Sequence, residues 1–403
     1  MDLSFLPEAL TLNLFILFSL ILLAGLAAGG IAHRTPFVPS ITAYMLVGMA
    51  IGPGGLGLLN YDMMASARIF IDIALALIML DLGRHLVVSW IRKHPSLLKA
   101  SALEVVLTLA LVTGGLVATG MPAVPSLVVA AIVLAASPAI LLLVVREFKV
   151  KGPVTDYATV LVGLNNFASV LVFAVAMVFM YGTGEASSWV TGVLHPLYLV
   201  AAGVGIAIVC LGVAEAVNLF GTEGRTARFS LLIAILMLAV GLSYMAGVPP
   251  MLTALFMGFI SANLKHETPL SEEPLGKEST LFFIILFVLA GAKMQLMALA
   301  TVLPLVLLVV VLRQVAKHAA ILAFTRKEFD LKQQVALGFC MLPMAGMAVG
   351  LIQTTDTYFP AIGGMLTGVV LGAVMVLETL GPVVTELALK AAGELKSGKK
   401  VGH

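Results

Sequence analysis

Two long apolar runs of this sequence are interrupted at their centres, one by Ala135-Ala136-Ser137-Pro138-Ala139 and the other by Met341-Leu342-Pro343-Met344-Ala345-Gly346. Proline removes a backbone donor and clashes with the preceding helical turn. In lipid, the freed carbonyls must be satisfied by protein, ions or water. These stretches predict two discontinuous transmembrane helices, broken at Pro138, Pro343 and Gly346. Their ends and free carbonyls could surround an ion at the bilayer midplane.

The composition around these interruptions is that of a membrane protein. Of 403 residues, 61% are hydrophobic and 11% are charged, and the mean hydropathy is +1.11. Soluble domains carry about 25% charged residues. Most of the chain therefore cannot face water, which excludes an ordinary soluble domain.

Charge clusters and Pro/Gly punctuation divide the chain into about thirteen apolar segments that can cross a bilayer. We predict an all-α membrane protein with transmembrane helices at 12–32, 37–58, 66–86, 98–119, 124–145, 153–181, 193–217, 228–246, 249–264, 278–295, 297–323, 331–353 and 360–389. Gly381-Pro382 predicts a further interruption in the last of these segments.

Basic residues are concentrated in every second connection between the segments. This set of connections includes Arg92 with Lys93, Arg146 with Lys149, and Arg326 with Lys327. By the positive-inside rule these connections are cytoplasmic. The chain is then expected in the inner (plasma) membrane, with its N-terminus outside, its C-terminus inside and a short basic cytoplasmic tail at 391–403.

The offset in sequence between Pro138 and Pro343 also maps other segments of the first half onto segments of the second half. It brings 66–86 onto 278–295, 98–119 onto 297–323, and 153–181 onto 360–389. Each counterpart comes seven segments later, an odd number, so the two halves have opposite orientations. The pattern predicts an inverted-topology repeat, which is typical of secondary transporters.

Three motifs resemble those of the cation/proton antiporter family, particularly its bacterial sodium or potassium/proton exchangers. The stretch Pro39-Ser40-Ile41-Thr42-Ala43-Tyr44-Met45-Leu46-Val47-Gly48, followed by Gly52-Pro53-Gly54-Gly55-Leu56-Gly57, is similar to the family's second-segment signature. Ala136-Ser137-Pro138 stands where the family has its first helix break, often T-D-P. Leu342-Pro343-Met344-Ala345-Gly346-Met347 resembles the second break.

The resemblance implies a homodimer in which a mobile core moves past a dimerisation scaffold. Residues 1–97 and 228–295 would form the scaffold, and residues 98–181 and 297–390 would form the core. The core would carry the ion at the two broken helices.

The sixth segment departs from the family pattern. Members usually have an Asn-Asp or Asp-Asp pair there, whereas this chain has Asn165-Asn166. The amide of Asn166 can offer its oxygen to an alkali cation but cannot release a proton near neutral pH. Any coupling to protons must therefore use another group. We expect Asn165, Asn166 and Ser137 to line the ion site and Asp156 to attract cations from the cytoplasmic side, although a place in the first helical turn also explains Asp156.

Ionisable residues inside the segments are functional candidates because charge is costly in a bilayer. Arg313 and Lys317 share one helical face. They are expected to compensate charge at the site, but Arg313 could instead tether broken-helix carbonyls and Lys317 could snorkel. The acidic candidates are Asp72, Asp81, Glu104 and Glu378. For Asp81, a local pair with Arg84 or His85 is an alternative.

The leading functional prediction is exchange of Na⁺ or K⁺ for protons by alternating access. Two alternatives are the same fold carrying a small anion or organic acid, and a transport-inactive membrane sensor or partner subunit. The sequence has no phosphate-binding glycine loop, zinc-ligand spacing or nucleophile constellation. We therefore expect no enzyme activity, no cofactor, no metal beyond a transported alkali ion, and no nucleic-acid partner; the partners would be the transported ions and membrane lipid.

Overall fold

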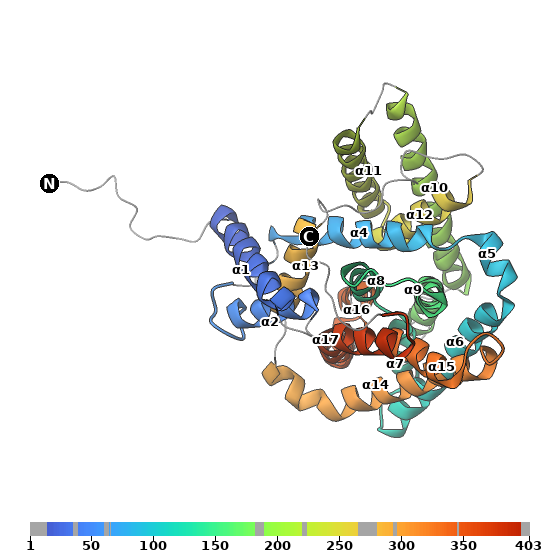
Figure 1. Ribbon diagram of the computed structural model, residues 1–403. Helices are drawn as coiled ribbons and strands as arrows, with labels where there is room; N and C mark the ends of the chain where they lie inside the picture. Colours follow the sequence, from blue (N-terminus) through green and yellow to red (C-terminus); the bar gives the residue numbers. More distant parts are fainter. Residues whose placement is uncertain are drawn as a thin grey trace. The chain divides into compact units, whose positions relative to one another are not determined.

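The computed structural model describes residues 14–34, 39–59, 64, 66–181, 189–219, 224–264, 280–292, 296–344 and 346–395 (Figure 1). Within these ranges every regular element is a helix. The N-terminal end of the chain and positions 396–403 of the predicted tail lie outside the described residues.

The predicted segments correspond to helices throughout the described ranges, and the two interrupted runs each form a pair of helices. The helices are α1 (Leu14–Arg34), α2 (Ser40–Ile51), α4 (Arg68–Arg84), α5 (Val88–Lys93), α6 (Pro95–Ala118), α7 (Ala123–Val133), α8 (Pro138–Glu147), α9 (Pro153–Tyr181), α10 (Trp189–Asn218), α11 (Arg225–Met245), α12 (Pro250–Asn263), α13 (Thr280–Ala292), α14 (Leu296–Phe324), α15 (Leu331–Cys340), α16 (Gly346–Tyr358) and α17 (Pro360–Ala391).

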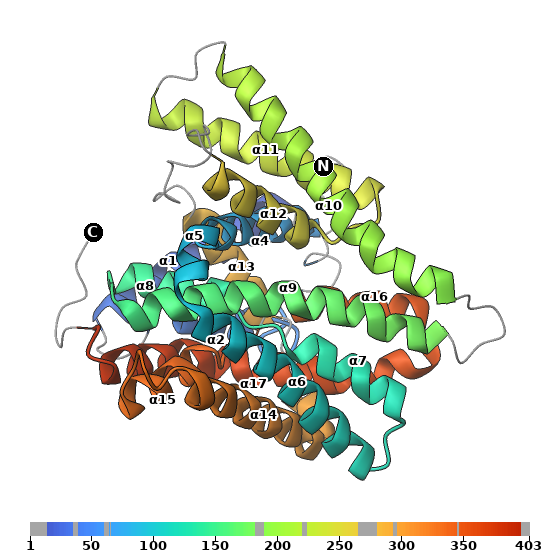
Figure 2. The ribbon, with the colours of Figure 1, turned by 90° about the vertical axis from the view of Figure 1, so that its right-hand side faces the viewer.

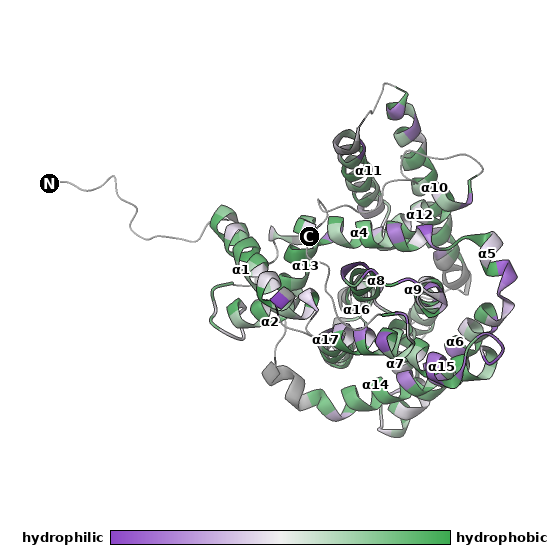
Figure 3. Ribbon diagram, in the orientation of Figure 1, coloured by the Kyte–Doolittle hydropathy of each residue, from purple (hydrophilic) through white to green (hydrophobic). Residues whose placement is uncertain are grey.

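The described helices are apolar enough for a multi-pass membrane protein. Within the described residues, the structure has 8 spans that are long and apolar enough to cross a bilayer, with α7 and α8 counted together as one span. Helices α2, α12 and α13 are apolar but shorter. In Figure 3 most of the helical ribbon has the green of hydrophobic residues. On α10, for example, Leu197, Ile208 and Val209 are exposed, as lipid-facing side chains would be. The number of membrane crossings stays a prediction.

Both predicted helix breaks are present. Helix α7 ends at Val133, and α8 begins at Pro138 with Ser137 as its N-cap. Proline suits the first position of a helix because its missing donor would have no partner there. Helix α15 ends at Cys340 and α16 begins at Gly346. These results confirm the two discontinuous helices.

The expected break at Gly381-Pro382 is wrong. Helix α17 continues from Pro360 to Ala391 with Pro382 inside it. A proline in a membrane helix is tolerated where packed neighbours satisfy the freed backbone groups. Here α17 packs against α14, α15 and α16.

The chain divides into two compact units. The first comprises Met1–Ile71 and Glu278–Gln295, and its described helices include α1, α2 and α13. Here α2 and α13 approach backbone to backbone, since a Cβ on Gly48 would meet the carbonyl of Val288. The expected division into scaffold and core follows other boundaries and stays a prediction.

The second unit comprises Asp72–Lys277 and Leu296–His403 and holds both broken helices. In Figure 2, α7 and α16 lie toward one end of α9, whereas α8 and α15 lie toward the other. The two broken segments therefore run in opposite directions, as the inverted repeat predicts. Helices α6 and α14, counterparts in the repeat, pack against each other.

Several basic connections of this unit meet at one end. The Glu394 carboxylate, just beyond α17, accepts hydrogen bonds from the backbone N–H groups of Val154 (2.6 Å) and Thr155 (2.9 Å) at the start of α9. The ring of Tyr157 packs against His94 and Phe329. The connections before α6, α9 and α15 and the end of α17 thus share one side of the unit, as the alternation of basic residues predicts.

Candidate functional site

The two helix breaks touch each other inside the second unit. The backbone N–H of Ser137 donates to the carbonyl of Pro343 at 2.8 Å. The Ser137 hydroxyl caps α8 by accepting from the N–H of Ile140 at 3.4 Å. Helix α17 passes the same point, because a Cβ on Gly381 would lie 2.9 Å from the Pro343 side chain. The crossing of α7–α8 with α15–α16 is therefore a direct backbone contact.

Arg313 of α14 binds both breaks. Its side chain is fully buried, at 0% exposure. The guanidinium donates from Nε to the carbonyl of Val133 (2.6 Å), from Nη1 to that of Leu342 (2.8 Å), and from Nη2 to that of Ala135 (2.8 Å). Longer contacts reach the carbonyls of Met341 and Pro343. The sequence left two interpretations of Arg313, charge compensation at the site and a tether for the broken-helix carbonyls. These contacts are those of a tether.

The remaining carbonyls of the first break also accept hydrogen bonds. Lys317 Nζ donates to the carbonyl of Leu134 at 3.4 Å, and Asn166 Nδ2 donates to that of Ala136 at 2.7 Å. Every carbonyl from Val133 to Ala136 therefore has a side-chain donor. For this break the expectation of free carbonyls around an ion is wrong, because side chains of α14 and α9 donate to all four.

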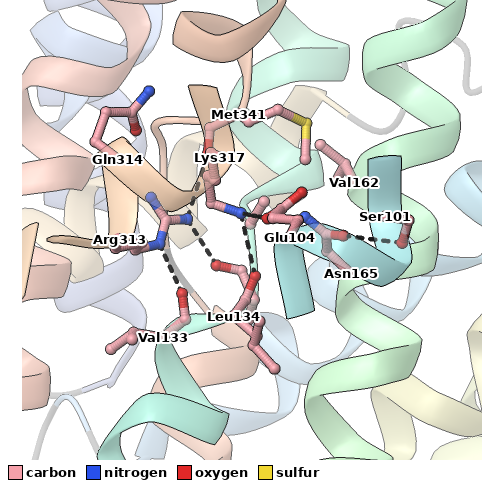
Figure 4. A network of polar contacts seen from close by, with 12 residues as sticks. Ser101, Glu104, Val133, Leu134, Val162, Asn165, Arg313, Gln314, Lys317 and Met341 are labelled. Carbon is pink, nitrogen blue, oxygen red and sulfur yellow. Dashed lines mark hydrogen bonds and ion pairs between the residues drawn. The ribbon is translucent and has the colours of Figure 1, made fainter. Parts of the chain in front are cut away.

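A buried ion pair lies beside this break (Figure 4). Lys317 of α14 forms an ion pair with Glu104 of α6, and the two side chains are 0% and 1% exposed. The same Glu104 oxygen, Oε1, accepts from Asn165 Nδ2 at 2.6 Å. Ser101 donates to the Asn165 oxygen at 3.5 Å. Lys317 therefore points into the site and does not snorkel.

Two side-chain oxygens beside the first break accept no hydrogen bond from any described residue. They are Oε2 of Glu104 and Oδ1 of Asn166, both on side chains at or below 1% exposure. The Asn166 amide nitrogen donates to the carbonyl of Ala136 and, at 2.8 Å, to that of Val162. Such orphaned acceptors are rare in buried surroundings. Hard cations prefer oxygen ligands of this kind.

Three other residues that the sequence singled out, Asp156, Asp72 and Glu378, lie outside this hydrogen-bond network. Asp156 is exposed in the first turn of α9, so the structure does not bring it to Asn166. Asp72 accepts a hydrogen bond from the hydroxyl of Tyr244 at 2.8 Å. Glu378 is buried one turn before Gly381, where α17 passes the second break.

The expected local pairing of Asp81 needs correction. Its buried carboxylate forms an ion pair with Arg146, at the far end of α8. His85 contacts the backbone carbonyl of Asp81 and not its carboxylate, at 2.8 Å. Tertiary packing supplies a partner from another helix, which spacing along one helix cannot reveal.

Sequence reasoning identified Glu104 as an intramembrane acid but did not pair it with Lys317. One signal could have joined them. The helices that carry the two residues are counterparts in the repeat, and a buried lysine requires an acidic partner. Ser101, one turn before Glu104, has no comparable signal.

The comparisons with known proteins agree with this architecture. A model of the family described as sodium/hydrogen exchanger, transmembrane, matches residues 17–391. No curated protein matches the sequence.

Two solved structures of the sodium proton antiporter MjNhaP1 from Methanocaldococcus jannaschii share the fold. The structure at pH 8 has a TM-score of 0.65 and 16% sequence identity, covering 96% of this chain and 99% of that one. The structure from an electron-microscopy map has a TM-score of 0.71 and 16% identity, covering 96% of this chain and 100% of that one. On the strength of the family match across almost its whole length, the chain belongs to the sodium/hydrogen exchanger family.

Proposed function

We propose that this protein exchanges a monovalent cation, Na⁺ or K⁺, for protons across a cytoplasmic membrane by alternating access. The observation that carries the proposal is the ion pair between Glu104 and Lys317, buried beside the point where two broken helices cross. Membership in the sodium/hydrogen exchanger family supports the reaction class. It also supports a transporter in preference to an enzyme.

The charges of the site favour coupling between cation and proton. Glu104 contributes one negative charge, whereas Lys317 and Arg313 contribute two positive charges, all within buried side chains. A further cation would add an uncompensated charge, which costs several kcal/mol per ion in a protein interior. Release of one proton from Lys317 as the cation binds Glu104 leaves the buried charge unchanged. Exchange of one cation for one proton would then be electroneutral.

The proton must be carried by Lys317 or Glu104 and not by the other polar residues of the site. The Asn166 amide does not titrate, and an arginine stays protonated in proteins. A lysine ammonium can release its proton. We propose that Glu104 takes the part that the family's usual aspartate plays in the sixth segment, and that Lys317 occupies the carboxylate when no cation is bound.

The anion alternative has less support. An anion would need the guanidinium of Arg313, whose three nitrogens already donate to carbonyls of both breaks. Displacing those bonds would leave buried carbonyls unsatisfied, at about 1–3 kcal/mol each. The orphaned atoms at the site are oxygens, which repel an anion.

The larger-scale features belong to the same proposal. Residues 98–181 and 297–390 would move as a core past a scaffold formed by 1–97 and 228–295, in a homodimer. The N-terminus would lie outside and the C-terminus in the cytoplasm. The gathering of basic connections at one end of the second unit supports this orientation.

Flux through purified protein in liposomes with a trapped pH-sensitive dye tests the function. Outward gradients of Na⁺ or K⁺ should acidify the lumen, whereas choline should not, and chloride and gluconate salts should behave alike. Glu104→Gln should abolish the signal. Asp72→Asn is the matched control, since it makes the same change in another helix, and should retain the signal. Anion-dependent flux would establish the alternative substrate, and no flux in the parent would refute exchange.

A further inference from the structure

We propose that Glu104 Oε2 and Asn166 Oδ1 are ligands of the transported cation. Asn166 then supplies a neutral ligand at the position where an acid is usual, and Glu104 supplies the only negative charge among the proposed ligands. The inference rests on the proposed function, and deepens it by assigning the atoms that hold the ion.

The first step is an elimination. Backbone carbonyls at a helix break are natural cation ligands, but here Val133 and Ala135 accept from Arg313, and Leu134 accepts from Lys317. Ala136 accepts from Asn166. In the second break, the carbonyls of residues 341–343 accept from Arg313, and that of Pro343 also accepts from the N–H of Ser137. These seven carbonyls already accept hydrogen bonds that hold the breaks together, which favours side-chain oxygens as ligands of the ion.

The second step is that two side-chain oxygens are free. Oε2 of Glu104 and Oδ1 of Asn166 are buried and have no hydrogen-bond partner among the described residues. Leaving such a group unsatisfied in a protein interior destabilises the folded state. A bound cation would satisfy both oxygens at once.

The third step is that both oxygens adjoin one short piece of chain. Lys317 joins Glu104 to the carbonyl of Leu134, and Asn166 binds the carbonyl of Ala136, two residues further on. Two residues of extended chain span about 7 Å. Asn165, next to Asn166 in α9, holds the other oxygen of Glu104. The network thus holds the two side chains beside neighbouring points of the first break.

The ligand set also indicates the class of ion. One carboxylate and one amide offer a single negative charge, already shared with the ammonium of Lys317. Divalent cations in proteins usually take several oxygen ligands with more negative charge. The pair therefore suits a partly hydrated monovalent cation, whose binding to Oε2 weakens the hold of Glu104 on Lys317.

Thermal melts of the detergent-purified protein test the assignment by binding alone. The melting temperature of the parent should rise with added Na⁺ or K⁺, with choline keeping the ionic strength constant, because an ion that binds the folded state stabilises it. Asn166→Ala should raise the midpoint of this titration at least tenfold. The paired variant E104Q/K317M, which removes both charges and avoids an unpaired lysine, should lose the response. Asn166→Asp should lower the midpoint.

Asn263→Ala is the matched control. Asn263 at the end of α12 accepts from the N–H of Val88 and donates to the carbonyl of Leu86, so its amide is fully engaged elsewhere. The variant should melt earlier but keep the parental midpoint. If Asn166→Ala does not fold, Asn166→Ser replaces it, because a helical serine can still donate to the carbonyl of Val162.

A parental midpoint, within twofold, in Asn166→Ala, or in Asn166→Ser where that variant replaces it, would remove Asn166 from the ligand set. A retained response in E104Q/K317M would likewise remove Glu104. Either result is distinguishable from failure of the proposed function. Cation-driven proton flux in liposomes would persist in the parent if only the ligands were wrong, and would be absent if the function were wrong.

Discussion

The two helix breaks have similar backbones but different chemistry. Both follow a short helix, and Ser137 of one donates to Pro343 of the other. The carbonyls of the first break are held by Arg313, Lys317 and Asn166. Among the described residues, the carbonyls of 341–343 in the second break accept from Arg313 and from the backbone of the first break.

This difference separates two functions of a broken helix. Repetition in inverted orientation supplies a matched pair of interruptions, which lets the chain cross itself inside the membrane. The groups proposed to exchange the cation and the proton then need to lie beside one break only. Glu104, Lys317 and the two asparagines all adjoin the first break, so we expect structural changes to affect both breaks and chemical changes to act through the first.

The largest effect is expected for Arg313→Met, because Arg313 binds both breaks. The variant leaves the buried carbonyls of Val133, Ala135 and Leu342 without their donor. At about 1–3 kcal/mol for each, the folded state should lose about 3 kcal/mol or more. The melting temperature in detergent reports this loss, and Arg313→Lys should recover only part of it because an ammonium lacks the planar fork of a guanidinium.

Arg326→Met provides the comparison for that variant. Arg326 is exposed just beyond the end of α14, and its Nε donates to the carbonyl of Leu322, four residues earlier. Its loss should change stability by less than about 0.5 kcal/mol. Equal melting temperatures for Arg313→Met and Arg326→Met would show that Arg313 does not hold the breaks.

A smaller effect, confined to the first break, is expected for Ser137→Ala. The variant removes the hydroxyl that caps α8 but keeps the backbone bond to Pro343. Loss of a serine N-cap costs about 1 kcal/mol. The cation midpoint should stay parental, because Ser137 is not among the proposed ligands. A large increase in that midpoint would place the Ser137 hydroxyl on the ion, as the sequence analysis expected.

The sequence predicted the fold well because its signals are local. Proline and glycine within an apolar run mark a broken helix wherever it packs. The same rule failed at Pro382, since neighbouring helices decide whether a proline interrupts a helix, and these contacts are not encoded in the motif.

The site was harder to predict from the sequence because the residues that contact one another there are distant in the chain. Glu104 and Lys317 are 213 positions apart, and Asp81 meets Arg146 across 65 positions. Spacing along one helix gave a local pair as one alternative for Asp81, and closeness to the cytoplasmic end gave snorkelling as one alternative for Lys317. Which donor satisfies which carbonyl depends on the packing of α14 against both breaks, and a hydropathy pattern carries no information on that packing.

The central claim is that cation binding and proton release occur at the Glu104–Lys317 pair. It is tested most directly by adding Na⁺ or K⁺ to purified protein in a weak buffer and measuring the protons released for each cation bound. The parent should release about one proton per cation, because ion binding displaces the proton that it competes with. E104Q/K317M should fold and release none. Release from E104Q/K317M equal to that of the parent would contradict the account, as would cation binding by the parent without any proton release.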